Sequence, residues 1–168
     1  LNAAGRLDDM SIGIRCLVAR EPATARALAA TLDALNKQRR QIEADMQTQA
    51  QAAVKGVGIW QDGQRHAGLS LFDAGWHQGV VGLVASRIKD RTGRPVVAFA
   101  PAGDGLELRG SARSIPGVHV RDVLESIATR HVGLIKRFGG HAMAAGLTID
   151  QPDLDRFARA FDTAVAER

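Results

Sequence analysis

The sequence is short of several residue types, and each shortage excludes a class of protein. A single cysteine, Cys16, rules out an internal disulfide and any zinc site built on several cysteines. Aromatic residues make up only 4% and tyrosine is absent, so a packed core must be aliphatic. No apolar run is long enough to span a membrane, and no signal-peptide pattern is present. We therefore expect a cytoplasmic protein with no membrane partner.

Patterns of metal ligands are also missing. There is no paired-carboxylate cluster with a histidine beside it, and no histidine stands near Asp8 and Asp9. His66, His119 and His131 show no metal-ligand spacing with Asp or Glu, so we interpret them as surface or core residues. Hydrolysis by two metal ions needs several Asp and His ligands that hold the ions about 4 Å apart. The sequence predicts no metal bound by this chain.

The composition that is present fits a packed domain with a mild basic excess. Of 168 residues, 45% are hydrophobic and 24% charged, and the formal net charge is +4. That excess is compatible with a polyanionic partner without demanding one. Because the chain opens at Leu1 with no initiator methionine, we expect a piece of a longer polypeptide.

A long helix is predicted near the N-terminus. Pro22 suits a first helical position and Gly56 a stop. Apolar residues recur between them in alternating steps of three and four, a heptad-like seam. Such a helix is about 50 Å long. We favour a connector between two lobes, and an ordinary packed helix remains the alternative. The predicted domains are the end of a truncated lobe (1–20), the connector (21–56) and an α/β domain (57–168).

The remainder alternates strand and helix patterns. Four successive apolar residues near position 97 indicate a strand that is buried on both faces. The fold class expected is α/β, with a mixed β-sheet flanked by helices and preceded by the connector helix. Strands are expected at 57–60 and 67–72 (around a turn at Asp62-Gly63), 95–100, 106–114 and 145–149, and helices at 10–19, 78–91, 120–127, 134–138 and 154–165.

The strand at 106–114 carries a polar face. Side chains alternate along a strand, which places Leu106, Leu108 and Ala112 on one face and Glu107, Arg109, Ser111 and Arg113 on the other. Arginine offers paired donors to phosphate oxygens, and a serine hydroxyl adds a neutral donor. This face suits a phosphodiester, and a merely solvated polar face is the alternative.

A glycine-rich segment follows at 139–146. Gly139 and Gly140 allow backbone N–H groups to approach an anion closely. His141 is able to donate to a phosphate oxygen or carry a proton. The residues after it are nearly all small. We interpret the segment as a phosphate-binding loop.

A third candidate lies at 74–82, before a predicted helix whose first N–H groups favour anions. Trp76 there is either a base-stacking residue or a core residue. His77 and Gln78 adjoin it, and Arg6 lies near Gly5 at the start of the chain.

Four segments occur in the order and context of RecJ-like exonucleases, which are single-strand-specific members of the DHH phosphoesterase family. They are Asn2-Ala3-Ala4-Gly5-Arg6-Leu7, Trp76-His77-Gln78-Gly79, Gly110-Ser111-Ala112-Arg113-Ser114-Ile115 and the run from Phe138 to Gly146. The resemblance covers nearly the whole chain. It implies the DHH-associated domain with its connecting helix, whereas the metal-binding Asp-His-His lobe and the following oligonucleotide-binding domain are absent.

By that resemblance, Ser111 and Arg113 look like part of a pocket for a terminal 5′ phosphate, and Arg6 like a further phosphate contact. Gly139, Gly140 and His141 look like a loop that faces the scissile phosphate. His77 and Gln78 are weaker carry-overs. No residue here is expected to be catalytic, apart from His141 if its phosphate contact takes part in the reaction.

The function expected of the parent is 5′-to-3′ exonuclease action on single-stranded DNA with a 5′ phosphate, in repair and recombination, with Mn²⁺ or Mg²⁺. This fragment is expected to bind no metal and to be inactive without the N-terminal catalytic lobe, its intramolecular partner. The alternatives are a DHH-family phosphoesterase acting on oligonucleotides or cyclic dinucleotides, and a non-catalytic nucleic-acid-binding appendage.

Overall fold

A computed structural model of the protein describes residues 3–56, 60–61, 64–103 and 105–168. The side chains of Arg6 and of residues 50–65 lie outside this description. The chain divides into two compact units, Leu1–Asp45 and Met46–Arg168. Among the described residues, no helix is both long and apolar enough to cross a membrane.

The first unit holds α1 (Ala4–Leu7), α2 (Ser11–Val18) and most of α3 (Pro22–Gly56). The predicted long helix is confirmed, and both of its ends match the proline and glycine signals. Ion pairs one turn apart support it, including Arg39 Nη1 to Glu43 Oε2 at 2.6 Å. The apolar neighbours of Cys16 indicate a buried thiol, but its side chain is only partly buried, with Sγ 3.8 Å from the Ala25 carbonyl oxygen.

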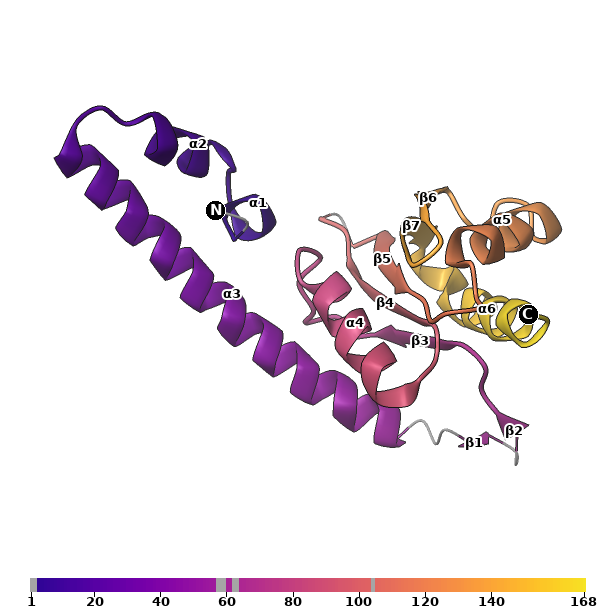
Figure 1. Ribbon diagram of the computed structural model, residues 1–168. Coiled ribbons are helices and arrows are strands. Elements are labelled where there is room, and N and C mark those ends of the chain that lie inside the picture. The colour runs from indigo at the N-terminus through magenta and orange to yellow at the C-terminus, as the bar shows by residue number, and fades with distance from the viewer. Residues whose placement is uncertain (1–2, 57–59, 62–63, 104) are drawn as a thin grey trace. The chain divides into compact units, whose positions relative to one another are not determined.

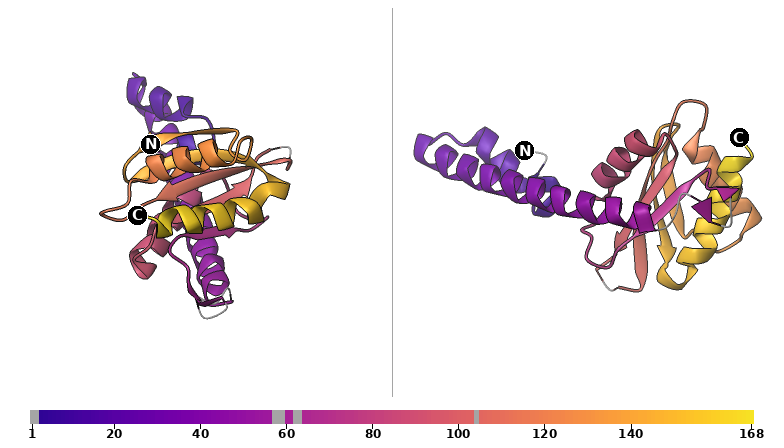
Figure 2. Two further views of the ribbon diagram at one scale, coloured as in Figure 1. Left: turned by 90° about the vertical axis from the view of Figure 1, so that its right-hand side faces the viewer. Right: turned by 90° about the horizontal axis from the view of Figure 1, so that it is seen from below.

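The second unit is built on a mixed sheet of five described strands in the order β3-β4-β5-β7-β6. Only the β3–β4 pair is parallel. The helix α4 lies on one face and the helices α5 and α6 lie on the other (Figures 1 and 2). The expected α/β class is confirmed. The bounds are β3 Leu69–Phe72, α4 Val81–Thr92, β4 Val96–Pro101, β5 Glu107–Arg113, α5 Val120–Arg130, β6 Arg137–His141, β7 Ala144–Asp150, the 3₁₀ turn η1 Gln151–Asp153 and α6 Leu154–Ala166.

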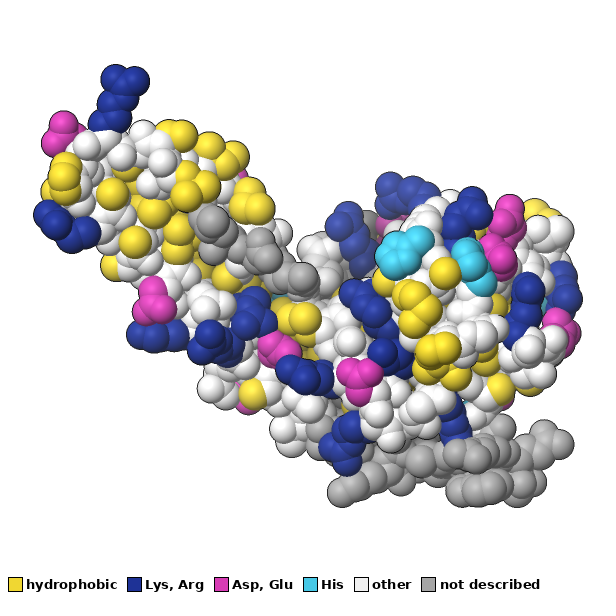
Figure 3. Space-filling view, viewed as in Figure 1, with side chains coloured by type: hydrophobic (Ala, Val, Ile, Leu, Met, Phe, Trp, Pro, Cys, Tyr) yellow, Lys and Arg dark blue, Asp and Glu magenta, His cyan; other side chains and the backbone are white. Residues whose placement is uncertain are grey.

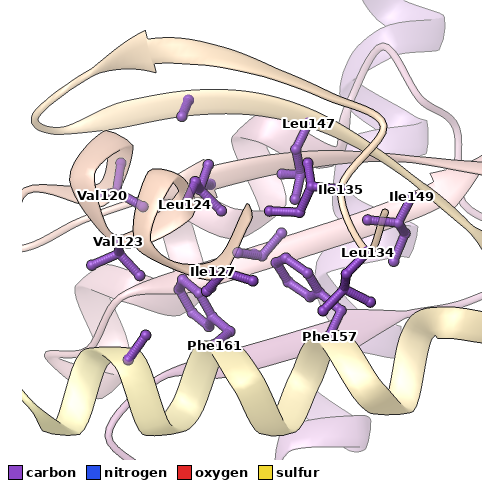
Figure 4. Close-up of a cluster of buried hydrophobic side chains, with 14 of the residues drawn as sticks. Val120, Val123, Leu124, Ile127, Leu134, Ile135, Leu147, Ile149, Phe157 and Phe161 are labelled. Atoms are coloured by element: carbon purple, nitrogen blue, oxygen red, sulfur yellow. The ribbon is translucent and has the colours of Figure 1, made fainter. Parts of the chain in front are cut away.

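The main core lies between the sheet and the α5–α6 pair (Figure 4). Phe99 of β4 meets Phe157 of α6 edge to face, with ring centroids 5.2 Å apart, and both side chains are fully buried. Burying each such side chain contributes about 1.5–3 kcal/mol. The strand β4 is buried on both faces from Val96 to Ala100, as its continuous apolar run predicts.

Asp162 of α6 ties that helix to the start of β3. One carboxylate oxygen accepts hydrogen bonds from the N–H groups of Ala67 (2.6 Å) and Gly68 (3.1 Å). The other lies 2.7 Å from Nδ1 of His66. Gly68 must be glycine here, because a Cβ atom would lie 2.8 Å from the Phe161 ring. The histidine therefore belongs to a structural contact.

Three local predictions are corrected by the structure. The helix predicted from position 78 begins at Val81. The predicted strand at 67–72 does not form a hairpin with the strand before it, because β1 (Trp60–Gln61) pairs with β2 (Gln64–Arg65), whereas β3 pairs with β4. The turn residues at 62–63 and the expected strand residues 57–59 lie outside the described part of the chain. The third correction concerns residues 134–138.

Residues 134–138 do not form the expected short helix. Leu134 and Ile135 are buried beneath α5 and α6, and β6 begins at Arg137. The segment at 139–146 is consequently a β-hairpin and not a loop, since β6 pairs with β7 on both sides of the turn. Apolar side chains at helical spacing here reach the core from a turn and from the first residues of β6.

Candidate nucleic-acid interface

Pairing among β5, β7 and β6 places four of the predicted site residues in neighbouring rows across one face of the sheet: Ser111, Arg113, Gly139 and His141. Ser111 lies opposite Gly146, and Gly146 lies opposite Gly139. Residues directly opposite each other on antiparallel strands project to the same face, so the three form one row. A Cβ atom on Gly82 of α4 would lie 3.0 Å from Ser111 Oγ, so this row is on the side of the sheet that carries α4. We call this side the α4 face.

The next row on the α4 face holds Arg113, Ala144 and His141, paired in the same way. Rows are about 6.7 Å apart along the strands, and neighbouring strands about 4.8 Å apart. The register therefore brings the predicted Ser-x-Arg pair of β5 to within about 10 Å of the glycine-histidine pair of β6. Gly140 projects to the opposite face and is not in either row.

The Arg113 guanidinium is held above Ser111. Its Nη1 lies 2.8 Å from Ser111 Oγ and donates to the Ala112 carbonyl oxygen at 2.8 Å. A Cβ atom on Gly82 would lie 2.6 Å from Nη2. Because Gly82 is in the first turn of α4, the positive end of the helix dipole lies beside the guanidinium and the hydroxyl. This combination of donors suits an oxyanion.

Next to Ser111, the α4 face carries no side chains on β7 and β6. Gly139 and Gly146 are exposed, and a Cβ atom on either would meet nothing within 4 Å. Glycine inside a strand is less stable than alanine by about 0.5–1 kcal/mol. Strand glycines without steric need often mark the close approach of a ligand. Two such positions lie side by side, next to Ser111.

Gly140 has a different reason to be glycine. Its φ is 152°, and a Cβ atom would collide with the Ala144 carbonyl oxygen and lie 2.5 Å from the Ala145 Cα atom. The conformation is needed for β6 to pair with β7 just before the turn. Besides its predicted role in phosphate contact, Gly140 is therefore required for the backbone conformation before this turn.

His141 ends β6 with an exposed side chain. Its Nδ1 accepts a long hydrogen bond of 3.4 Å from the Met143 N–H. With Nδ1 accepting, the neutral ring carries its proton on Nε2, which is then a donor toward other partners. The position suits hydrogen bonding to a phosphate oxygen.

The segment before α4 has a structural role in the described residues. His77 Nδ1 accepts from the Gly79 N–H at 3.1 Å and shapes the turn into the helix. Gln78 is exposed. Trp76 is only 4% exposed and donates from Nε1 to Gln49 Oε1 at 2.9 Å, which favours a core residue over base stacking. The side chain of Arg6 lies outside the described part of the chain.

Acidic residues bound the α4 face at the far end of β5 and β7, where Glu107 lies opposite Asp150. Lys136 Nζ contacts Asp150 Oδ1 at 2.6 Å and Glu107 Oε1 at 3.0 Å. The hydrogen bonds that Lys136 donates, first to Asp150 and then to Glu107, raise its pKa. Figure 3 shows Lys and Arg side chains and histidines gathered over the part of the unit where β5, β6 and β7 lie.

Gly82 is the residue that sequence reasoning missed. The pattern at 74–82 indicates a helix start, but it singles out His77 and Gln78 and not Gly82. The available signal was a glycine in a predicted helix, where alanine is favoured by about 1 kcal/mol. Its partner in space, Arg113, is 31 positions away along the chain, and no local pattern joins them.

The described side chains form no candidate metal site, because no three His, Cys, Asp or Glu residues among them are grouped closely enough to hold an ion. The hydrogen-bonded His119 instead caps α5 by accepting from the Asp122 N–H at 3.3 Å. The donor set of the α4 face is one of arginine, hydroxyl, imidazole and backbone N–H, which suits anions.

These features define an α/β domain that presents one open, cation-bearing sheet face. The chain belongs to the DHHA1 domain family, whose profile matches residues 63–167. It is 53% identical over 167 residues to the single-stranded-DNA-specific exonuclease RecJ of Dickeya dadantii strain 3937, an alignment covering 99% of this chain and 29% of that protein. The enzyme of the same description from Escherichia coli K12 is 50% identical over 167 residues, again 29% of its length.

Structural comparison agrees. The crystal structure of RecJ from Thermus thermophilus in complex with Mg²⁺ is similar with a TM-score of 0.83 at 30% identity, covering 99% of this chain and 24% of that one. The chain therefore spans less than a third of the length of these relatives. The predicted resemblance to the RecJ-like family is confirmed.

Proposed function

We propose that this chain is the substrate-binding part of a metal-dependent 5′-to-3′ exonuclease that hydrolyses single-stranded DNA in repair and recombination. The observation that carries the proposal is the Arg113 guanidinium, held over Ser111 at the first turn of α4 by contacts of 2.8 Å. The relatives named above support the substrate, because they are described as specific for single-stranded DNA.

Ser111, Arg113 and the N-terminal turn of α4 bind the terminal 5′ phosphate. Arginine supplies two parallel donors, the hydroxyl a third, and the helix end further N–H groups with a favourable dipole. A terminal phosphate carries more charge than an internal diester, so this cluster distinguishes a 5′ phosphate from a 5′ hydroxyl. In single strands the log–log salt dependence is about −0.7 per phosphate contact, and three to five contacts give a slope of roughly −2 to −3.5.

The test is Arg113→Gln in this chain, titrated with single strands that carry a 5′ phosphate or a 5′ hydroxyl. Loss of charge-assisted hydrogen bonds of about 1.5–3 kcal/mol weakens binding of the phosphorylated strand by about 10- to 150-fold, and of the hydroxyl strand by much less. Arg121→Gln is the matched control, since Arg121 is exposed on α5, which packs against the opposite face of the sheet. Equal losses on both strands contradict the 5′-phosphate pocket.

His141, with Gly139 and Gly140, contacts the scissile phosphate at β6, across the exposed Gly146 from the Arg113 site. The separation of about 10 Å between β5 and β6 accommodates one nucleotide between the two phosphate sites. His141 holds the phosphate and does not cleave the bond. Gly146→Val tests the glycine surface between β5 and β6: a Cβ atom at position 146 would meet nothing within 4 Å, and the added side chain is expected to weaken DNA binding.

Arg6 is a further phosphate contact in this proposal. His77 acts on the substrate through the turn that begins α4, and Gln78 adds an exposed polar contact.

The division into 1–20, 21–56 and 57–168 separates the end of a catalytic lobe, a connector and the DHH-associated domain. The catalytic lobe is the partner of this chain within the longer protein, and the whole protein acts in the cytoplasm.

The parent uses Mn²⁺ or Mg²⁺, in keeping with solved RecJ structures that contain either ion. The described residues offer no fitting ligand set, so the ions are held by other parts of the longer protein. Metal ions of this kind would supply the attacking hydroxide, and the residues of this chain would position the strand. The 168-residue chain alone is inactive in this proposal. Metal-dependent degradation of single-stranded DNA by the pure chain, lost when its own residues are mutated, would overturn this assignment.

A further inference from the structure

A third row crosses the α4 face beside the two rows already described. Arg109 of β5 lies opposite Thr148 of β7, and Thr148 lies opposite Arg137 of β6. Both arginine side chains are exposed, Arg137 by 71%, whereas Thr148 is 7% exposed. Two guanidinium groups thus rise from the strands on either side of a small, buried central residue.

The charges of these two arginines are largely available. The Arg109 side chain makes no hydrogen bond or ion pair with the described part of the chain. Among the described residues, the Arg137 side chain has one long ion pair, from Nη2 to Glu107 Oε2 at 3.6 Å. Glu107 is also paired with Lys136 Nζ at 3.0 Å. Arg130 on α5 shows the contrast, since its Nη1 contacts both oxygens of Glu167 at 2.9 and 2.7 Å. With respect to the described residues, the third row is therefore a cationic site without a strong internal counter-ion.

The spacing of the rows fits a polyanion chain. Along β6 the α4 face carries His141, Gly139 and Arg137, each about 6.7 Å from the next. A scissile phosphate that lies over Gly139, within reach of His141, is one such interval from Arg137, and this interval is close to the advance per nucleotide of an extended single strand. Beyond Arg137 the face becomes acidic at Glu107 and Asp150, so a strand that follows β6 finds one more cationic row and then repulsion.

We propose that Arg109 and Arg137 together form a subsite for one phosphodiester, the one that follows the scissile phosphate on its 3′ side. The subsite rests on the proposed function, because the order of phosphates starts from the 5′ phosphate at Arg113. It adds a third contact point, after Arg113 and His141, and it limits this face to three phosphates. Thr148 gives the two guanidinium groups room to converge on one phosphate.

Ligand length tests this assignment in the 168-residue chain. The ligands are 5′-phosphorylated thymidylates of one, two, three and six nucleotides, measured by competition against a fluorescent single strand. The double variant Arg109→Gln/Arg137→Gln is expected to bind the one- and two-nucleotide ligands as the parent chain does. For the three-nucleotide ligand, its affinity is expected to fall on the order of tenfold relative to the parent chain. For the six-nucleotide ligand, the expected loss of affinity is no larger.

Salt dependence tests whether the two arginines share one phosphate. Sharing predicts that the log–log slope for the six-nucleotide ligand falls by about 0.7 in the double variant, whereas two separate contacts predict about 1.4. The double variant Arg109→Lys/Arg137→Lys keeps the charges and is expected to restore the slope. Arg121→Gln removes one exposed arginine from α5 and is expected to leave all ligands unchanged. Thermal unfolding checks that each variant is folded.

Two outcomes separate the failure of this inference from that of the proposed function. If Arg113→Gln weakens every phosphorylated ligand but the Arg109/Arg137 variant weakens none, or all lengths equally, the subsite is refuted and the 5′-phosphate pocket stands. If Arg113→Gln has no effect on any ligand, the proposed function itself fails.

Discussion

A methyl group added at Gly82 is expected to disrupt the Arg113 site without unfolding the domain. The Cβ atom of Gly82→Ala would lie 2.6 Å from Arg113 Nη2 and 3.0 Å from Ser111 Oγ. An ordinary carbon contact is about 3.5–4.0 Å, so the guanidinium must move by about 1 Å. It is the far end of a flexible side chain, which makes the movement possible at little cost to the fold.

The displacement acts on binding through the hydrogen bonds of Arg113 to Ser111 and the Ala112 carbonyl, both 2.8 Å. Losing the pre-set geometry of one charge-assisted donor pair costs about 1.5–3 kcal/mol, or roughly 10- to 150-fold in affinity for a 5′-phosphorylated strand. Stability is expected to stay level or rise, because alanine is favoured over glycine by up to about 1 kcal/mol in a helix.

The assay compares the affinities for 5′-phosphate and 5′-hydroxyl strands with the urea midpoint of the same sample. Gly103→Ala is the control, since a Cβ atom there meets nothing within 4 Å and its φ is not in the left-handed region. An unchanged preference for the 5′ phosphate, or a loss of stability as large as the loss of affinity, would refute the role given to Gly82.

Three further changes test the framework around the face. Gly140→Ala is expected to destabilise the domain by about 1–3 kcal/mol in urea unfolding because of its φ of 152°, whereas Gly146→Ala, with open space above it, is expected to cost nothing. Asp162→Asn is expected to cost about 1–3 kcal/mol, because the carboxylate that accepts two backbone N–H groups and faces His66 is lost; a urea midpoint equal to that of the parent chain would contradict it. The raised pKa of Lys136 means that its ion pairs stabilise the fold below about pH 10.5 and lose this effect as pH rises through the folded-state value, so Lys136→Met should lower the urea midpoint at about pH 8, and by less once the pH is high enough to deprotonate Lys136.

The sequence predicted those elements whose pattern is complete within one segment. The long helix shows its proline start, its glycine stop and its seam within one stretch of chain. The strand β4 is an unbroken apolar run. The face of β5 with Ser111 and Arg113 follows from alternation alone, so these two residues were paired correctly without any tertiary information.

Prediction failed where an apolar pattern has two meanings. Leu134, Ile135 and Phe138 have helical spacing, yet the chain there enters the edge strand β6. That single error turned a hairpin into a loop and left Arg137 off the α4 face. Trp76 was equally open to two interpretations, and only its burial and its hydrogen bond to Gln49 favour the core.

The sequence by itself determined which residue types face the same way within each strand and helix, because side-chain direction follows from local backbone geometry. Only the tertiary structure decided which strands are neighbours and in what register, since pairing depends on contacts between distant segments. That register places Ser111 beside Gly146 and Gly139, and Arg109 in one row with Arg137. It also lets Gly82 meet Arg113, a contact that depends on how closely α4 packs on the sheet.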